Sequence, residues 1–260
     1  MTKENYTFGD NDRASGRLRR LAELYEPETR ELLRRGGART PRLAVDLGCG
    51  PGWSTRLLQD VLKPERTVGL DTSERYLAEA RHNQGSDLEF YLHDIVGAPF
   101  PVPAADAMLC RFLLTHVTSP GRVLGVWASA AEQGARLFVH ETESLQSEHP
   151  ALRRYYELVR QMQSHYGQML YVGRVLEACF AGSGWRLLES ERRVLEKPAR
   201  RMAELHLVNL RTWRDDEYAR RVLDREALDS LDASLERIAD GVEDGGTILN
   251  AARQIIAERE

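Results

Sequence analysis

Three glycines that follow a short apolar segment are the part of this sequence best suited to holding a ligand. Residues 42–47 are typical of a buried parallel strand, and Gly48, Gly50 and Gly52 come directly after them. Glycine lets the backbone turn tightly and approach a ligand, because no Cβ atom stands between them. The residues from Trp53 onward predict a helix. A strand, a glycine turn and a helix N-terminus together indicate a nucleotide-type site.

Acidic residues stand next to this turn and at the ends of the following two predicted strands. Asp46 lies two residues before Gly48, the strand 66–70 is followed by Asp71, and the strand 88–92 is followed by Asp94. A carboxylate after the second strand can accept hydrogen bonds from both hydroxyls of a ribose. The glycine spacing is G-x-G-x-G, whereas the dinucleotide fingerprint is G-x-G-x-x-G, so a dinucleotide-dependent oxidoreductase is disfavoured.

With these motifs in this order, the sequence resembles the class I S-adenosylmethionine-dependent methyltransferases that act on small molecules. The resemblance covers roughly residues 1–195. It implies S-adenosyl-L-methionine as the cofactor, with the glycine turn facing its methionine part and the later acids facing its ribose and adenine. The residues that the resemblance assigns to the cofactor are Tyr6, Arg17, Asp46, Gly48, Gly50, Gly52, Asp71, Thr72, Asp94, Ile95 and Arg111.

Two of these acids have an alternative role in local structure. Asp71 could cap the next helix, but Ser73 is the better placed N-cap and leaves Asp71 for the ribose. Asp94 could equally be a turn residue. Tyr6 precedes the first predicted helix and is expected to fold over the cofactor, and Arg17 is a candidate partner for the cofactor carboxylate.

Three side chains are candidates for a general base. His116 follows the fourth predicted strand, and His140 and Glu141 follow the fifth, so all three are expected near the cleft at the carboxyl ends of the strands. A hydroxyl or carbon-acid acceptor requires a base, whereas an amine or a carboxylate requires positioning alone. His116 could instead bond the backbone of its own helix, and Glu141 could belong to a solvated loop. The spacing of these residues predicts no metal site.

Strands alternate with helices along most of the chain, which predicts an α/β fold. Strands at 42–47, 66–70, 88–92, 106–110, 135–139 and 185–195 indicate a Rossmann-like, doubly wound, seven-stranded and mostly parallel sheet with helical lid insertions. The last strand, from residue 246 onward, is expected to be an antiparallel edge strand, because the sheet of the resembling family ends in a reversed hairpin; a helix is the alternative. The N-terminal helix is expected over 12–35, with Pro27 breaking it.

The domain organisation follows from this pattern. We expect an N-terminal helical cap over residues 1–37 and a methyltransferase domain over 38–260, with lid insertions at 145–171 and 198–244. The insertions are rich in Tyr, Met, His and Trp, which commonly line small-molecule pockets. The residues expected to contact the acceptor are Tyr155, Tyr166, Met169, His206 and Trp213. The alternative is that these side chains form a hydrophobic core of the lid.

The composition limits the class of protein. The chain has 260 residues, is 42% hydrophobic and carries a net charge of −4, which disfavours a nucleic-acid partner. No apolar run approaches the ~18 residues that a membrane span needs. The 3 cysteines lack disulfide or zinc spacing, so a cytoplasmic protein is expected. We expect a small-molecule acceptor and a monomer or homodimer. Three functions remain open. The protein could transfer a methyl group to O, N or C, or it could consume the cofactor without methyl transfer, as in a cyclisation that releases methylthioadenosine. It could also bind the cofactor without catalysis.

Overall fold

A seven-stranded sheet organises the described part of the chain. The computed structural model describes residues 12–37 and 40–260, and the strand order is β3-β2-β1-β4-β5-β7-β6. The first five strands in this order are parallel, and β7 runs antiparallel, as predicted. The expected edge position of β7 is wrong, because β6 pairs with its other side and forms the edge of the sheet. The strands are β1 (Leu43–Leu47), β2 (Arg66–Asp71), β3 (Glu89–Leu92), β4 (Ala105–Arg111), β5 (Ala131–Gln146), β6 (Trp185–Pro198) and β7 (Thr247–Arg259).

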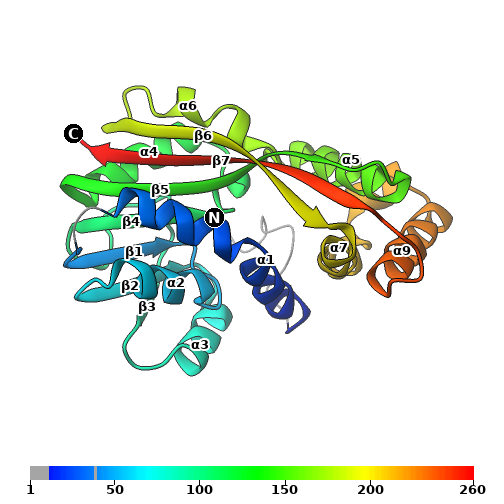
Figure 1. Ribbon diagram of the computed structural model, residues 1–260, viewed down its shortest axis with the longest axis horizontal. Helices are drawn as coiled ribbons and strands as arrows, with labels where there is room; N and C mark the ends of the chain where they lie inside the picture. Colours follow the sequence, from blue (N-terminus) through cyan, green and yellow to red (C-terminus); the bar gives the residue numbers. More distant parts are fainter. Residues whose placement is uncertain (1–11, 38–39) are drawn as a thin grey trace.

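Helices cover both faces of the sheet (Figure 1). On one face α1 and α2 enclose a hydrophobic cluster that includes Leu32, Leu58 and Phe138. On the other face α4 and α6 cover a larger cluster that contains Trp127 and Leu176. The helices are α1 (Asp12–Gly36), α2 (Trp53–Leu62), α3 (Glu74–Asn83), α4 (Pro120–Ser129), α5 (Pro150–His165), α6 (Leu176–Cys179), α7 (Ala199–Trp213), α8 (Glu217–Val222) and α9 (Arg225–Ala239).

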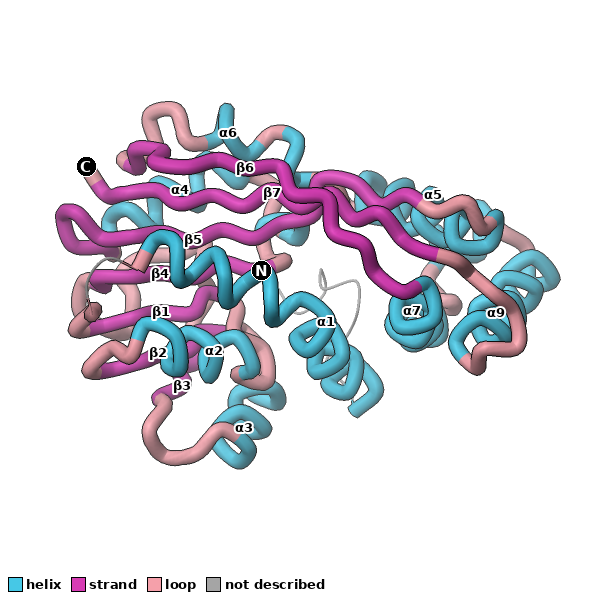
Figure 2. The backbone as a smooth tube through the Cα atoms, in the orientation of Figure 1, coloured by secondary structure: helices cyan, strands magenta, loops and turns pink. Residues whose placement is uncertain are grey.

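The last three strands are longer than expected and carry a second layer of helices. β5 begins at Ala131 and continues to Gln146, well beyond the predicted 135–139, and its register with β7 extends to Gln146 opposite Leu249. Figure 2 shows these long strands leaving the parallel part of the sheet and ending near α5, α7 and α9. Because β7 supplies backbone partners to both neighbours, the predicted lid rests on extended sheet rather than on loops alone.

The N-terminal helix differs from its prediction. Helix α1 is continuous over 25 residues with Pro27 inside it, although a break was expected there. Proline removes one backbone hydrogen bond. The buried residues on either side of it, Tyr25, Thr29, Leu32 and Leu33, pack against the rest of the protein and hold both halves in place. Tertiary burial therefore outweighs the local cost of the proline.

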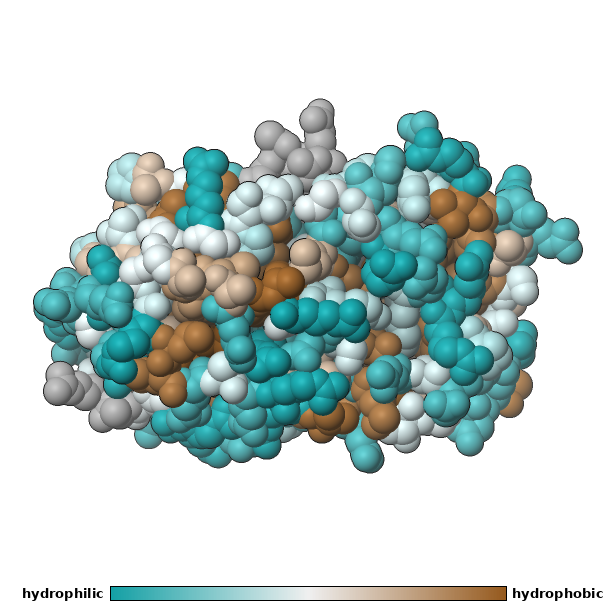
Figure 3. Space-filling view, turned by 90° about the horizontal axis from the view of Figure 1, so that it is seen from above, coloured by the Kyte–Doolittle hydropathy of each residue, from teal (hydrophilic) through white to brown (hydrophobic). Residues whose placement is uncertain are grey.

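The outermost strand, β6, combines exposed apolar side chains with ion pairs. Leu187, Leu188 and Val194 are exposed. Among the charged residues of the strand, Arg193 pairs with Glu31 of α1 at 2.7 Å. The face seen from above in Figure 3 correspondingly mixes hydrophilic and hydrophobic residues. Charged side chains on an edge strand discourage pairing with the edge of another copy.

The described residues also limit two kinds of site. Within residues 12–37 and 40–260, no helix combines the length and the apolar character needed to cross a membrane. The same residues contain no cluster of three or more His, Cys, Asp or Glu side chains able to hold a metal ion. Cys49, Cys110 and Cys179 are all free thiols.

Candidate active site

A cavity of about 260 Å³ opens at the carboxyl ends of the parallel strands, with α1 and α7 contributing to its wall. Its floor contains Gly48, Gly50 and Asp71, and its other walls include Arg17 of α1, Glu141 of β5 and His206 of α7. These residues are far apart in the sequence. The fold brings them together because the carboxyl ends of parallel strands meet at one edge of the sheet.

The glycine turn requires its glycines. Gly48, Gly50 and Gly52 have φ angles of 68°, 52° and 84°, a left-handed conformation that disfavours other residues. A Cβ atom on Gly48 would lie 2.6 Å from the Leu113 side chain, and one on Gly52 would lie 2.9 Å from Phe90. The turn is therefore closely packed from below, and its upper side faces the cavity.

Asp71 holds this turn from the neighbouring strand. Its Oδ2 accepts a hydrogen bond from the Gly50 N–H at 2.8 Å, and its Oδ1 accepts one from the Ser73 N–H at 2.8 Å. Ser73 is the N-cap of α3, as predicted, since its side chain accepts from the Tyr76 N–H. Asp71 and Thr72 both line the cavity. One carboxylate thus fixes the backbone of two loops that face the same space.

Asp46 lies behind the turn and outside the cavity lining. It is 1% exposed, and its Oδ2 accepts hydrogen bonds from Ser54 and Thr55 of α2, both at 2.7 Å. Burial raises the pKa of Asp46 to about 6, and the two hydroxyl hydrogen bonds oppose that shift. The structure therefore gives Asp46 a supporting position behind the turn.

At the other end of the cavity, the third strand supplies a turn. His93 and Ile95 line the cavity, whereas Asp94 lies outside the lining and its Oδ1 accepts from the Val96 N–H at 3.2 Å. The Ile95 carbonyl accepts from the Trp127 indole at 3.0 Å, which fixes the turn to α4. Tyr6, expected to cover this region, lies outside the described residues.

Two arginines, Arg17 and Arg111, line the cavity. Burial lowers the pKa of Arg111, and the carboxylates of Asp46 and Glu26 oppose that shift. Among the residues that the structure describes, none forms an ion pair or a side-chain hydrogen bond with Arg111. A partly buried guanidinium that faces a cavity without such a partner favours an anionic group on a ligand.

Glu141 is one of two base candidates that the structure places at the cavity. It is fully buried, and its Oε1 accepts hydrogen bonds from the backbone N–H groups of Leu113 and Leu114, both at 2.7 Å. Its Oε2 is buried and has no hydrogen-bond partner among the described residues. Burial raises the pKa of Glu141 to about 7, and the two N–H groups oppose the shift. Near neutral pH both protonation states are therefore populated.

The two histidine candidates differ in position. His116 lines the cavity and hydrogen-bonds Gln168, and burial, with a smaller effect of Arg17, lowers its pKa to about 4. His140 lies outside the cavity lining, because its side chain points to the opposite face of β5. There its Nδ1 lies 2.9 Å from the Thr29 hydroxyl and its ring packs against Phe112. Both imidazoles are neutral at pH 7.

Of the five residues expected to contact an acceptor, His206 alone lines the cavity. Tyr155 and Trp213 are buried in the hydrophobic cluster formed by α5, α7 and α9, where Tyr155 stacks on His206 at 4.4 Å between ring centroids. Tyr166 and Met169 are exposed at 40% and 44%. Tyr155 and Trp213 lie on helix faces that pack into the lid, and Tyr166 and Met169 follow the end of α5 outside the cavity lining.

Beside His206, which was predicted, the structure adds residues that the sequence reasoning missed. Met202, Leu205, His206 and Asn209 line the cavity and follow one another on α7 at intervals of three, one and three residues, which places them on one helix face. This spacing was visible in the sequence. Gln163 of α5 and Asn250 of β7 also line the cavity. Their positions depend on the long strands and could not be read from any local pattern.

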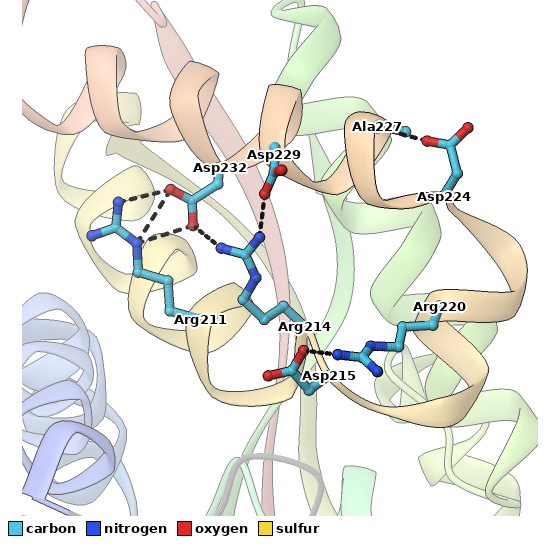
Figure 4. A network of polar contacts seen from close by, with 8 residues as sticks. All are labelled: Arg211, Arg214, Asp215, Arg220, Asp224, Ala227, Asp229 and Asp232. Atoms are coloured by element: carbon cyan, nitrogen blue, oxygen red, sulfur yellow. Dashed lines mark hydrogen bonds and ion pairs between the residues drawn. The ribbon is translucent and has the colours of Figure 1, made fainter.

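Ion pairs hold α7 in this orientation. Arg211 contacts both carboxylate oxygens of Asp232 on α9, with the closest approach at 2.7 Å, and Arg214 contacts Asp229 and Asp232 (Figure 4). In Figure 4 these side chains point toward α9. The arginines near the end of α7 therefore fasten the helix to its neighbour, while its cavity-lining face carries His206 and Asn209.

Comparison with known families agrees with this geometry. Residues 45–139, which run from β1 through β5 and contain the glycine turn and Asp71, match the family described as "Methyltransferase domain". This methyltransferase-domain match spans less than half of the chain. The resemblance inferred from the motifs and the Rossmann-like fold are both confirmed.

Individual relatives cover this domain in part. The trans-aconitate 2-methyltransferase of Methylobacterium radiotolerans is 51% identical over 102 residues, which is 38% of this chain and 38% of that protein. The chain thus matches less than half the length of the curated relatives.

Two solved structures resemble the whole fold. The [4+2]-cyclase SpnF has a TM-score of 0.57 and 17% identity, covering 90% of this chain and 80% of its own. Geranyl diphosphate C-methyltransferase from Streptomyces coelicolor, solved with S-adenosyl-L-homocysteine, has a TM-score of 0.54 and 15% identity, covering 98% of this chain and 87% of its own. These likenesses concern the fold.

Proposed function

We propose that this protein binds S-adenosyl-L-methionine and transfers its methyl group to a small-molecule acceptor. The observation that carries the proposal is the glycine turn, whose Gly50 N–H is held by Asp71 and which faces a cavity within the methyltransferase match. The cofactor supplies a methyl group activated by a sulfonium, so the protein has to hold it, align the acceptor and exclude water.

The lining residues suit the parts of this cofactor. The backbone of the glycine turn at Gly48 and Gly50 would hold the methionine part, with Gly52 completing the turn outside the lining, and Asp71 with Thr72 would hold the ribose. Ile95 and His93 would border the adenine. Arg111 offers a charge to the cofactor carboxylate, because it lacks an ion pair among the described residues.

The remaining assignments act from behind or from above. Asp46 would support the turn through α2, and Asp94 would shape the turn that presents Ile95. Helix α1, in the N-terminal cap over residues 1–37, and the segments 145–171 and 198–244 would form the lid. In support, Arg17 of α1, Gln163 of α5 and His206 of α7 line the cavity. A cavity of this kind suits a small molecule.

Product analysis tests the proposal. The purified chain is titrated with S-adenosylmethionine in a calorimeter and then incubated with pools of hydroxyl, amine, carboxylate and carbon-acid acceptors, trans-aconitate included. Methyl transfer releases adenosylhomocysteine in step with a methylated acceptor. Methylthioadenosine without methylated product would favour cofactor consumption of another kind, and binding without turnover would favour a non-catalytic cofactor-binding protein. Competition by NADH at comparable concentration would contradict the cofactor assignment.

A further inference from the structure

Part of the cavity lining combines apolar side chains with buried polar atoms that lack partners. Tyr25, Leu145, Leu170, Met202 and Leu205 supply the apolar surface. Within residues 12–37 and 40–260, five buried polar atoms of this part of the lining have no hydrogen-bond partner. These are Glu141 Oε2, Gln163 Nε2, His206 Nδ1, Asn209 Oδ1 and Asn250 Oδ1. Buried polar atoms are normally hydrogen-bonded, so this wall suits an apolar ligand that carries a few polar groups.

The amide side chains are each anchored at one end. Asn250 Nδ2 lies 2.6 Å from the Tyr25 hydroxyl, Gln163 Oε1 lies 3.4 Å from the Thr115 hydroxyl, and Asn209 hydrogen-bonds Tyr155. An anchored amide presents its other end in a fixed direction. The wall is therefore preorganised for hydrogen bonding rather than filled by mobile side chains.

Glu141 differs from the other members because it lies next to the glycine turn. Its Oε1 is bonded to the Leu113 N–H, and the Leu113 side chain packs directly beneath Gly48. Phe112, the residue before Leu113, has a φ angle of 52°, a left-handed conformation that is uncommon outside glycine. The strained turn and the two N–H bonds fix one oxygen of Glu141, and the second oxygen stays without a partner beside the proposed methionine site.

Building on the proposed function, we infer that the acceptor is an apolar molecule that presents an O–H group to Glu141, which removes its proton during methyl transfer. The acceptor oxygen forms the new bond to the methyl carbon with its own electron pair. The carbon–sulfur bond breaks with its electrons remaining on sulfur, and the hydroxyl proton passes to Glu141 Oε2. The products are a methyl ether and adenosylhomocysteine.

The chemistry of Glu141 favours this acceptor class over a carboxylate. Cys110 of β4 is the titratable group in contact with Glu141, at 3.6 Å. Arg17, Arg111, His116 and His206 line the same cavity from α1, β4, the turn after β4 and α7. A carboxylate acceptor needs no base, and it would meet an ionised Glu141 as a like charge. A hydroxyl acceptor needs a base, and the neighbouring His116 is a weak one, because burial lowers its pKa to about 4.

The acceptor class is tested first with the unmodified protein. 2-Naphthol, 2-methoxynaphthalene, 2-naphthoate and trans-aconitate are titrated into the adenosylhomocysteine complex, and a wider set of phenols, alcohols, amines and carboxylates is assayed for adenosylhomocysteine release. We expect turnover with phenols or alcohols, and binding of 2-naphthol at least 10-fold tighter than binding of 2-naphthoate or 2-methoxynaphthalene. Turnover confined to carboxylates or amines would overturn the inference and leave the proposed function intact. Cofactor binding with no turnover of any acceptor would overturn the proposed function itself.

The role of Glu141 is tested with the variant Glu141→Gln, whose amide oxygen can still accept from Leu113 and Leu114. We expect kcat to fall by about 10²–10⁴-fold, while binding of 2-naphthol to the adenosylhomocysteine complex changes less than 10-fold. The acidic limb of the pH profile of kcat/KM, expected near pH 7, should disappear. The matched control is Glu132→Gln at the exposed start of β5, which should leave rate and profile unchanged. A kcat within 3-fold of the parent with the acidic limb retained would exclude Glu141 as the base. If the variant does not fold, the acceptor panel with the unmodified protein still tests the inferred acceptor class.

Discussion

Asp71 offers the sharpest test of the cofactor site, because its carboxylate connects two cavity loops. Each of its oxygens accepts one backbone hydrogen bond at 2.8 Å, from Gly50 and from Ser73. The variant Asp71→Ala removes both acceptors and the charge that would face the ribose. A hydrogen bond to a charged group contributes about 1.5–3 kcal/mol. We therefore expect the affinity for adenosylhomocysteine to fall by about 1–3 kcal/mol, which is roughly 5–150-fold in Kd.

The control has to separate lost binding from lost stability. Asp106 is a close match, because its Oδ2 accepts hydrogen bonds from the backbone N–H groups of Arg42 and Leu43, both at 3.0 Å, at the opposite edge of the sheet. Both Asp71→Ala and Asp106→Ala should lower the melting temperature. Only Asp71→Ala should weaken binding, as measured by calorimetric titration below the melting transition of each variant.

Two results would refute this reasoning. If Asp71→Ala binds adenosylhomocysteine as tightly as the parent protein while remaining folded, Asp71 does not face the ribose. If Asp106→Ala weakens binding by the same factor, the effect of Asp71 is transmitted through general loosening of the sheet. The intermediate variant Asp71→Asn keeps an acceptor oxygen but loses the charge, so its affinity should lie between those of the parent and Asp71→Ala.

Three further predictions concern stability. Burial lowers the pKa of His140 and His206 to about 3, so the native state keeps both neutral while the unfolded state takes up protons below about pH 6.5. The free energy of unfolding, measured with urea, should therefore fall as the pH drops from 6.5 toward 3, by up to ~5 kcal/mol for each residue. The variant His140→Asn should show a shallower slope. Trp213→Ala should cost about 3–5 kcal/mol of unfolding free energy and leave the KM of an acceptor unchanged, because Trp213 is buried outside the cavity lining. Arg211→Met should lower the free energy of unfolding by about 1–2 kcal/mol, and by less in high salt, because it removes the bidentate contact with Asp232 from a partly exposed pair. A larger effect on the KM than on the melting temperature would show that the orientation of α7 matters more than the stability of the protein.

The cofactor side of the cavity was largely predictable because its signals are local. The glycine turn and Asp71 each follow a strand directly, and parallel pairing of β1 with β2 brings the two strand ends to one edge. Once the strands are recognised, no long-range information is needed to place these residues together. Asp46 and Asp94 also lie next to these strand ends, but their carboxylates contact the protein itself: Asp46 accepts from Ser54 and Thr55, and Asp94 accepts from the Val96 N–H.

The acceptor side was less predictable because residue type does not say which way a side chain points. Tyr155 and Trp213 have the size and polarity of pocket residues, and the same properties make them good core residues beside α9. Which face of α7 meets the cavity depends on the ion pairs of Arg211 and on the strand extensions that carry α5 and α9. Those extensions arise from pairing with β7, more than 100 residues after β5 begins. Pro27 illustrates the same point, since the local rule predicted a break and distant packing preserved the helix.

The adjacent pair His140 and Glu141 shows how a single geometric rule separates two equal candidates. Side chains alternate between the faces of a strand, so neighbouring residues on β5 face opposite sides. Phe138 packs with α1 and α2 and assigns His140 to that face, whereas Val139 packs with the cluster under α4 and assigns Glu141 to the other. The sequence places both residues at the rim, but a strand that was predicted to end at residue 139 carries no alternation beyond that point. Because β5 in fact continues to Gln146, the alternation extends through the rim and leaves Glu141, rather than His140, facing the cavity.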